Sequence, residues 1–151
     1  MISKKLIDLV EKHEDELTRR WLKEVKQHVD TPMYRSFPEH QLRERVYNVY
    51  IHLTQWIEDK LSREQVEKAY TALGAERYRE GYRLSEVVKA LMLAHRNLDT
   101  YVRELTVFDV ASQLHQLVEL DDSVTTFFDL AIFYTIKGYE HELTVDRKVK
   151  A

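Results

Sequence analysis

The sequence predicts an all-α fold: one domain, built as a helical bundle of about five main helices with a long C-terminal helix. Three observations lead to this prediction. The chain has only 3 Gly and 2 Pro among its 151 residues, too few for the turns of a β-sandwich, a barrel or a doubly wound sheet. Apolar residues recur at steps of three and four, which is the helical period. The length suits a single core.

The first helix is expected over residues 2–29. Its apolar stripe consists of Ile2, Leu6, Leu9, Val10, His13, Leu17, Trp21, Val25 and Val29. Residues 30–38 hold both prolines of the chain, so they are expected to form a loop, with a short extra turn near 32–38. Ser36 and Glu39 have the spacing of a capping box. This pair predicts the start of a second helix that runs to about Lys60.

Ser62 and Gln65 repeat the capping-box spacing and predict the start of a third helix. This helix is expected to extend to Glu80, because Gly81 suits the left-handed conformation that often follows a helix. Ser85 is then expected to cap a fourth helix, whose apolar stripe runs to about Leu105.

The last helix is expected from about Asp109 to Glu140. Between Val124 and Ile136 its apolar arc is wider than one helix face, so this helix is either central to the bundle or shared with a second subunit. Four residues of this arc are the predicted dimer interface: Val124, Phe127, Phe128 and Ala131.

Residues 1–140 are taken as a sensory or regulatory domain and residues 141–151 as a polar tail or the start of a linker.

Composition excludes several classes of protein. A formal net charge of −3 gives no overall basic field for nucleic acid. The absence of Cys removes disulfides, thiolate metal sites and thiol catalysis, and it fits a reducing cytoplasm. The N-terminal segment turns acidic before a long apolar run develops, so no signal peptide is expected. No stretch approaches about 18 uninterrupted apolar residues, so no membrane-spanning segment is expected.

The chain carries none of the common catalytic motifs. Glu-x-x-His, His-Glu-x-x-His, a glycine-rich phosphate loop and Gly-x-Ser-x-Gly are all absent from the sequence. Its many carboxylates have the spacing of salt bridges on solvated helix faces. The sequence therefore predicts a protein that is not an enzyme and that needs no metal ion and no cofactor.

Four residues are candidates for binding a small ligand: Tyr70, Arg77, His95 and Arg96. His95 lies on the apolar stripe of the fourth helix, where it is either a core histidine or a ligand of haem iron. Arg77 continues the apolar stripe of the third helix, and Arg96 follows His95. An inward guanidinium needs a carboxylate or an anionic ligand, unless the side chain extends to the surface. Tyr70 either packs in the core or lines a pocket.

Two segments, ERYREGYRLSEVV at 76–88 and HRNL at 95–98, carry a resemblance to a known family. They resemble the N-terminal sensor domain of RsbR-type RsbT co-antagonists, which also precedes some bacterial sensor histidine kinases. The positions that match the family pattern are Arg77, Gly81, Leu84, Glu86, Val87 and Arg96. Trp21 and the closing segments FDLAIFY at 128–134 and KGYE at 137–140 fit as well. The family commonly has Leu where this chain has His95.

The resemblance implies a globin-like helical domain that usually lacks haem, is commonly dimeric and has no activity of its own. The function expected is that of a non-enzymatic cytoplasmic sensory domain in bacterial stress signalling. It would act as a homodimer and relay a signal through its last helix to an output module, which is either C-terminal or a separate protein. Two alternatives stay open: a haem or small-ligand sensor that uses His95, and a scaffold that only docks partners.

Overall fold

The computed structural model describes residues 2–105 and 110–150, and these residues form helices without any strand. The all-α prediction is therefore confirmed. In chain order the elements are α1 (Ile2–Lys12), α2 (Glu14–Gln27), the 3₁₀ helix η1 (Pro32–Ser36), α3 (Glu39–Ile57), α4 (Arg63–Arg79), α5 (Leu84–Leu105) and α6 (Val110–Lys150).

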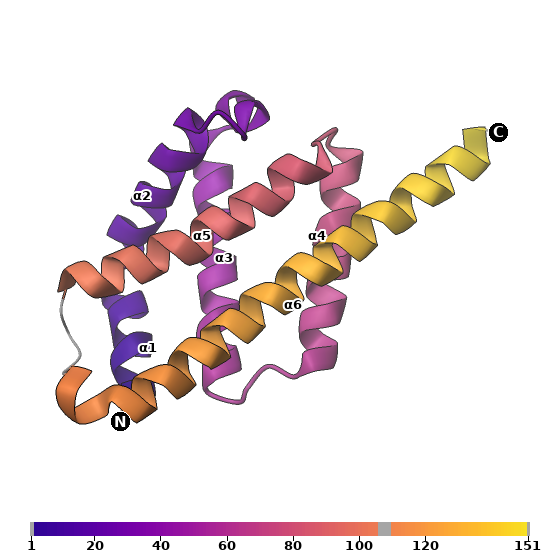
Figure 1. Cartoon of the computed structure of the whole chain (residues 1–151). Coiled ribbons are helices and arrows are strands. Elements are labelled where there is room, and N and C mark those ends of the chain that lie inside the picture. Colours follow the sequence, from indigo (N-terminus) through magenta and orange to yellow (C-terminus); the bar gives the residue numbers. More distant parts are fainter. Residues whose placement is uncertain (1, 106–109, 151) are drawn as a thin grey trace.

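The helices are arranged so that α5 and α6 lie across the others. Figure 1 shows α1 with α2, α3 and α4 running along similar axes, while α5 and α6 cross them obliquely. The most extensive contact between two helices is that of α4 with α6. The buried residues of all these helices form one cluster, which agrees with the single core expected from the chain length.

The first predicted helix is divided into α1 and α2 at His13. The backbone of His13 has φ −113° and ψ 19°, outside the helical range, and its ring contacts Tyr101 of α5 edge-on, with the ring centroids 5.5 Å apart. The Nδ1 atom lies 2.9 Å from the Tyr101 hydroxyl oxygen. The spacing of three and four continues across the break when His13 is counted between Val10 and Leu17, so the periodicity alone could not reveal it.

Some of the predicted helix boundaries are confirmed and others are wrong. Ser62 and Gln65 form both hydrogen bonds of a capping box at the start of α4, and Gly81 has φ +88°. The expected short turn is η1. Ser36 does not cap α3, because it belongs to η1 and Pro38 occupies the N-cap position without a side-chain hydrogen bond. Ser85 lies inside α5, one residue after its start.

Helix α6 is longer than the sequence predicted. It continues past Glu140 to Lys150 as a mostly exposed helix, so the polar stretch after residue 140 is helical as far as it is described. The predicted start near Asp109 and the terminal Ala151 lie outside the described residues. Figure 1 shows the C-terminal part of α6 projecting beyond the rest of the bundle.

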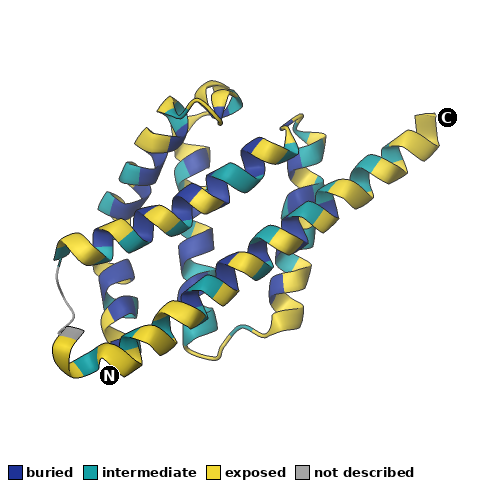
Figure 2. Cartoon of the chain, in the orientation of Figure 1, coloured by how far each residue is buried: buried dark blue, intermediate teal, exposed yellow. Residues whose placement is uncertain are grey.

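The four residues predicted to form a dimer interface lie in the core of the single chain, as Figure 2 illustrates for this stretch of α6. Phe127, Phe128 and Ala131 are 0% exposed, and Val124 is 4% exposed. Phe127 contacts Trp56 of α3 and Tyr70 of α4. These side chains therefore offer no surface to a second subunit. The wide apolar arc reflects the central position of α6 within its own bundle.

The contact between α4 and α6 depends on two glycines. A Cβ atom at Gly74 would overlap the carbonyl oxygen of Thr135, and a Cβ atom at Gly138 would overlap the carbonyl oxygen of Thr71. Each glycine thus faces the backbone of the opposite helix. Backbones this close leave no room for a side chain larger than hydrogen.

We expect Gly138→Ala to lower the free energy of unfolding by about 1–3 kcal/mol, because the added methyl group forces α4 and α6 apart. Intrinsic helix propensity alone predicts the opposite sign, a gain of up to about 1 kcal/mol. Urea unfolding monitored by circular dichroism measures the difference. The neighbouring exposed Lys137→Ala is the control and should change stability little. A stabilised Gly138→Ala variant would contradict the packing described.

Candidate functional site

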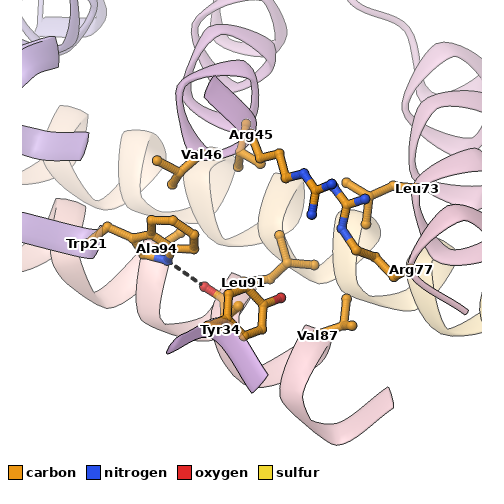
Figure 3. Close-up of a pocket in the computed structure, with 11 residues that line it drawn as sticks. Trp21, Tyr34, Arg45, Val46, Leu73, Arg77, Val87, Leu91 and Ala94 are labelled. Atoms are coloured by element: carbon orange, nitrogen blue, oxygen red, sulfur yellow. Dashed lines mark hydrogen bonds between the residues drawn. The ribbon is translucent and has the colours of Figure 1, made fainter. Parts of the chain in front are cut away.

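A small cavity lies where α2, η1, α3, α4 and α5 meet. Its volume is about 40 Å³. The lining is apolar and aromatic apart from two arginines, and consists of Trp21, Tyr34, Arg45, Val46, Val49, Leu73, Arg77, Val87, Ala90, Leu91 and Ala94. Figure 3 shows the guanidinium groups of Arg45 and Arg77 side by side at one end of this cavity.

The two arginines share one carboxylate. Arg77 donates from Nη1 to Oε1 of Glu80 at 2.9 Å, and Arg45 donates from Nη2 to the other oxygen, Oε2. Arg77 is only 6% exposed. Glu76, which is largely exposed, is 3.9 Å from Arg77. Two cations at the cavity are thus paired closely with a single carboxylate.

Two buried polar atoms beside this cluster form no hydrogen bond of ordinary length and angle: Nη1 of Arg45 and the hydroxyl of Tyr82. The Tyr82 ring packs between Tyr34 and Phe37, with both centroid distances at 4.7 Å. Burial raises the pKa of Tyr82 to about 12, although the charges of Arg45 and Arg77 and an interaction of the hydroxyl with the Arg45 guanidinium act in the opposite direction. An unpaired buried guanidinium nitrogen is costly, so this corner has the capacity to accept a further polar group.

The walls of the cavity are fixed by buried hydrogen bonds between helices. Trp21 of α2 donates from Nε1 to the carbonyl oxygen of Ala90 on α5 at 3.0 Å. The Tyr50 hydroxyl of α3 donates to the carbonyl oxygen of Ala94 at 2.7 Å. Asn97 donates from Nδ2 to the carbonyl oxygen of Leu17 and to the Tyr50 hydroxyl. These bonds join α2, α3 and α5, three of the elements that line the cavity.

Of the four candidate ligand residues, Arg77 alone lines this cavity. Tyr70 is buried elsewhere in the core, with its hydroxyl 3.0 Å from Nδ1 of His52. Burial lowers the pKa of His52. Arg96 is exposed on α5, beside a surface hollow that Arg20 and Lys23 also line. The structure does not bring all four residues into one site. Tyr70 and Arg77 do line a common hollow of about 410 Å³ between α3 and α4.

His95 is half-buried and stacks on Phe128, with the ring centroids 4.6 Å apart and the planes 3° from parallel. Its Nε2 atom lies 3.5 Å from Oδ2 of Asp99 and is buried without a hydrogen bond. Burial raises the pKa of Asp99, opposed by the charge of His95.

This setting does not fit haem. An axial histidine must present its nitrogen to the open space in which the porphyrin lies, whereas Nε2 of His95 faces Asp99. The hollow that Asp99 lines, between α1, α5 and α6, measures about 160 Å³. A cavity of about 150 Å³ holds one benzene, so this hollow is far smaller than a porphyrin requires.

The described residues hold neither a cluster of metal ligands nor a helix suited to a membrane. Residues 2–105 and 110–150 contain no group of three or more His, Asp or Glu side chains placed to hold a metal ion. Within the same ranges, no helix combines the length and the apolar character that crossing a membrane requires.

Arg45 was missed by the sequence analysis, although a signal was present. It follows Leu42 by three residues and precedes Val49 by four, so it lies on the apolar stripe of its helix. A basic residue at such a position often extends its charged end to the surface. Its partner Glu80 is 35 positions away in the chain, and no local pattern links the two.

Comparison with known proteins gives one family. The sequence model of this family, the RsbT co-antagonist protein RsbRD N-terminal domain, matches residues 15–147. The matched range extends from the start of α2 through nearly all of α6. No curated protein and no solved structure matches the chain. The globin-like topology therefore stays a prediction.

Removing the hydroxyl of a buried tyrosine should affect stability differently depending on whether that hydroxyl is hydrogen-bonded. We expect Tyr82→Phe to raise the free energy of unfolding by about 1 kcal/mol, because it removes a buried hydroxyl without a partner. Tyr50→Phe should lower it by about 1–3 kcal/mol, because Ala94 and Asn97 then lose a partner. Chemical denaturation of both variants provides the comparison. An equal loss in both would show that the Tyr82 hydroxyl has a partner.

Proposed function

Because the chain belongs to the family of the RsbT co-antagonist protein RsbRD N-terminal domain, we propose that it is a non-enzymatic sensory domain of bacterial stress signalling. In this proposal the domain works in the cytoplasm as a homodimer. It relays a change in the helical bundle along α6 to an output module, either a kinase or a regulator, that is C-terminal to it or a separate protein.

The observation that carries the proposal is the attachment of α6 to the end of α4. Beyond the glycine contact, the Tyr78 hydroxyl donates to Asp146 of α6, and Arg79 donates to Glu142 at 3.1 Å. The Tyr139 hydroxyl of α6 donates to the carbonyl oxygen of Tyr82 in the turn after α4. A displacement of this turn therefore acts directly on the C-terminal half of α6.

The form of α6 suits a relay. Its 41 residues make a rod of about 60 Å at about 1.5 Å per residue, and its C-terminal end projects from the bundle (Figure 1). Shifts and rotations of rigid helices are an established way in which signalling proteins pass a change from one place to another. An output module joined to the projecting end would receive such a motion.

The homodimer is supported by exposed apolar side chains that remain on α6 after its core residues are buried. Leu114, Val118 and Phe133 are 59%, 52% and 51% exposed. Exposed apolar groups along one long helix are a natural contact for the same helix of a second copy. The dimer surface proposed here replaces the four buried residues that the sequence analysis assigned to it.

We expect sedimentation equilibrium to give twice the mass of the chain. Val118→Glu and Phe133→Glu should weaken the dimer by about tenfold or more, because a charge replaces an apolar contact. Val29→Glu is the matched control, since Val29 is 80% exposed between α2 and η1. A wild-type chain that sediments as a monomer contradicts the homodimer.

The double variant Tyr78→Phe with Arg79→Gln tests the attachment of α6. We expect amide hydrogen exchange in residues 141–150 to become about tenfold faster, because both side-chain ties to this segment are lost. Exchange in the core of α6 and the melting temperature should change little. The exposed Glu67→Gln on α4 serves as the control. Unchanged exchange at residues 141–150 would mean that the turn after α4 does not hold the projecting segment.

A further inference from the structure

The hollow between α1, α5 and α6, which is far smaller than haem requires, has the size of a single carbon ring. Its volume is about 160 Å³, and a cavity of about 150 Å³ holds one benzene. It lies where the N-terminal third of α6 meets α1 and the last turns of α5 (Figure 1). Its aliphatic lining consists of Leu6, Leu98, Val102, Leu117, Leu120 and Val124. These walls suit an apolar group of about six carbon atoms.

The rest of the lining is charged and consists of Asp99 and Arg103 of α5 and Asp121 of α6. Among the described residues, the carboxylate of the half-buried Asp99 accepts no hydrogen bond. Its ion-pair partner there is Nε2 of His95 at 3.5 Å, which is charged only when protonated. Within residues 2–105 and 110–150, no ion pair joins Arg103 to either aspartate. Two carboxylates and one guanidinium give the lining a formal charge of −1.

The two carboxylates repel each other at the mouth of an apolar hollow. Burial raises the pKa of Asp99, and the charge of His95 opposes this increase. The charge of Asp121 raises the pKa further, against the charge of Arg103. A positive charge bound between Asp99 and Asp121 would stabilise both carboxylates in their ionised form.

An organic ammonium ion matches both parts of this lining. Its N–H groups donate charge-assisted hydrogen bonds to carboxylates, while its carbon atoms fill the aliphatic walls. An anion would meet the negative charge of the lining. A neutral hydrocarbon would leave the half-buried carboxylate without a partner. A metal ion is a poorer match, because aliphatic side chains offer it no further oxygen ligand.

We propose that this hollow binds a small organic ammonium ion, with an apolar group of about six carbon atoms inside and the ammonium group on Asp99 and Asp121. The inference rests on the proposed sensory function, for which it supplies the class of stimulus. The ligand would join α5 to α6. Leu117 lines the hollow, and its neighbours on α6, Leu114 and Val118, are exposed in the proposed dimer surface. Occupancy would therefore act on the stretch of α6 that the dimer uses.

Benzylamine, which is protonated at neutral pH, is the probe. Methyl ¹H–¹³C spectra of a chain labelled at Leu and Val report on the aliphatic walls directly. We expect benzylamine to shift the signals of Leu120 and Val124 saturably, because its ring would lie beside them, and to leave Leu42 in the core of α3 in place. A ligand of this size should have a dissociation constant of about 0.1–10 mM.

Two compounds with the same ring test the part played by charge. Benzyl alcohol is neutral, and benzoate is negative. We expect benzyl alcohol to bind about tenfold more weakly than benzylamine, because it lacks the charge-assisted hydrogen bonds. Benzoate should give no saturable shift at equal ionic strength, because its charge has the sign of the lining.

Variants connect the shifts to the site. Asp99→Asn should weaken benzylamine binding by about tenfold, and Asp121→Asn by about threefold, because Asp121 is exposed. Asp122→Asn is the matched control: Asp122 is the next residue of α6, is also exposed and does not line the hollow. Leu117→Trp should abolish binding by filling the hollow. An unchanged Leu42 signal shows that each variant is folded.

The opposite results overturn the inference. If benzyl alcohol or benzoate binds as tightly as benzylamine, the site does not select an ammonium ion. If Asp122→Asn weakens binding as much as Asp121→Asn does, the attraction is a general effect of surface charge. If the Val118→Glu chain binds benzylamine and the wild-type dimer does not, a second copy occupies the hollow.

The inference and the proposed function fail separately. Lack of any saturable shift in a chain that sediments as a dimer, and in its Val118→Glu variant, refutes the ligand and leaves the proposed function standing. Binding of benzylamine to a wild-type chain that sediments as a monomer, with the expected loss in Asp99→Asn, refutes the homodimer and supports the site.

Discussion

The close approach of α4 and α6 is the constraint on which the rest of the structure depends. Gly74 and Gly138 each face a carbonyl group of the opposite helix, so the two helices meet backbone to backbone at this point. Such a contact has almost no freedom to slide, since side chains that could change rotamer are absent from it. It fixes the position of α6, which in turn carries Phe127 and Phe128 into the centre of the core.

The second constraint is electrostatic. Placing the buried guanidinium of Arg77 and the half-buried one of Arg45 beside aromatic rings is unfavourable unless they are paired, and Glu80 pairs with both of them at the end of α4. This arrangement joins α3 to the turn between α4 and α5. The same turn is bound to α6 through Tyr78 and Tyr139. The cluster of Arg45, Arg77 and Glu80 and the projecting part of α6 are therefore connected through the same end of α4.

Local features of the fold could be predicted from the sequence. The capping box at Ser62 and the positive φ of Gly81 depend on residues within a few positions, and the apolar spacing gives the helices. Features that depend on residues far apart in the chain could not be predicted from the sequence. The pairing of Arg45 with Glu80 links two helices, and the width of an apolar arc does not reveal whether its partner is the same chain or another. For this reason Phe127 and Phe128 were assigned to an interface that the structure replaces with core packing.

The break at His13 gives the two ends of the molecule different mechanical characters. Helix α1 is joined to α2 by one residue that is not helical, although the backbone hydrogen bonds from His13 to Leu9 and from Leu17 to His13 continue across this joint. Helix α6 has no such joint along its described length. The relay proposed above would therefore run along the helix that has no such joint, because a continuous helix moves as one body.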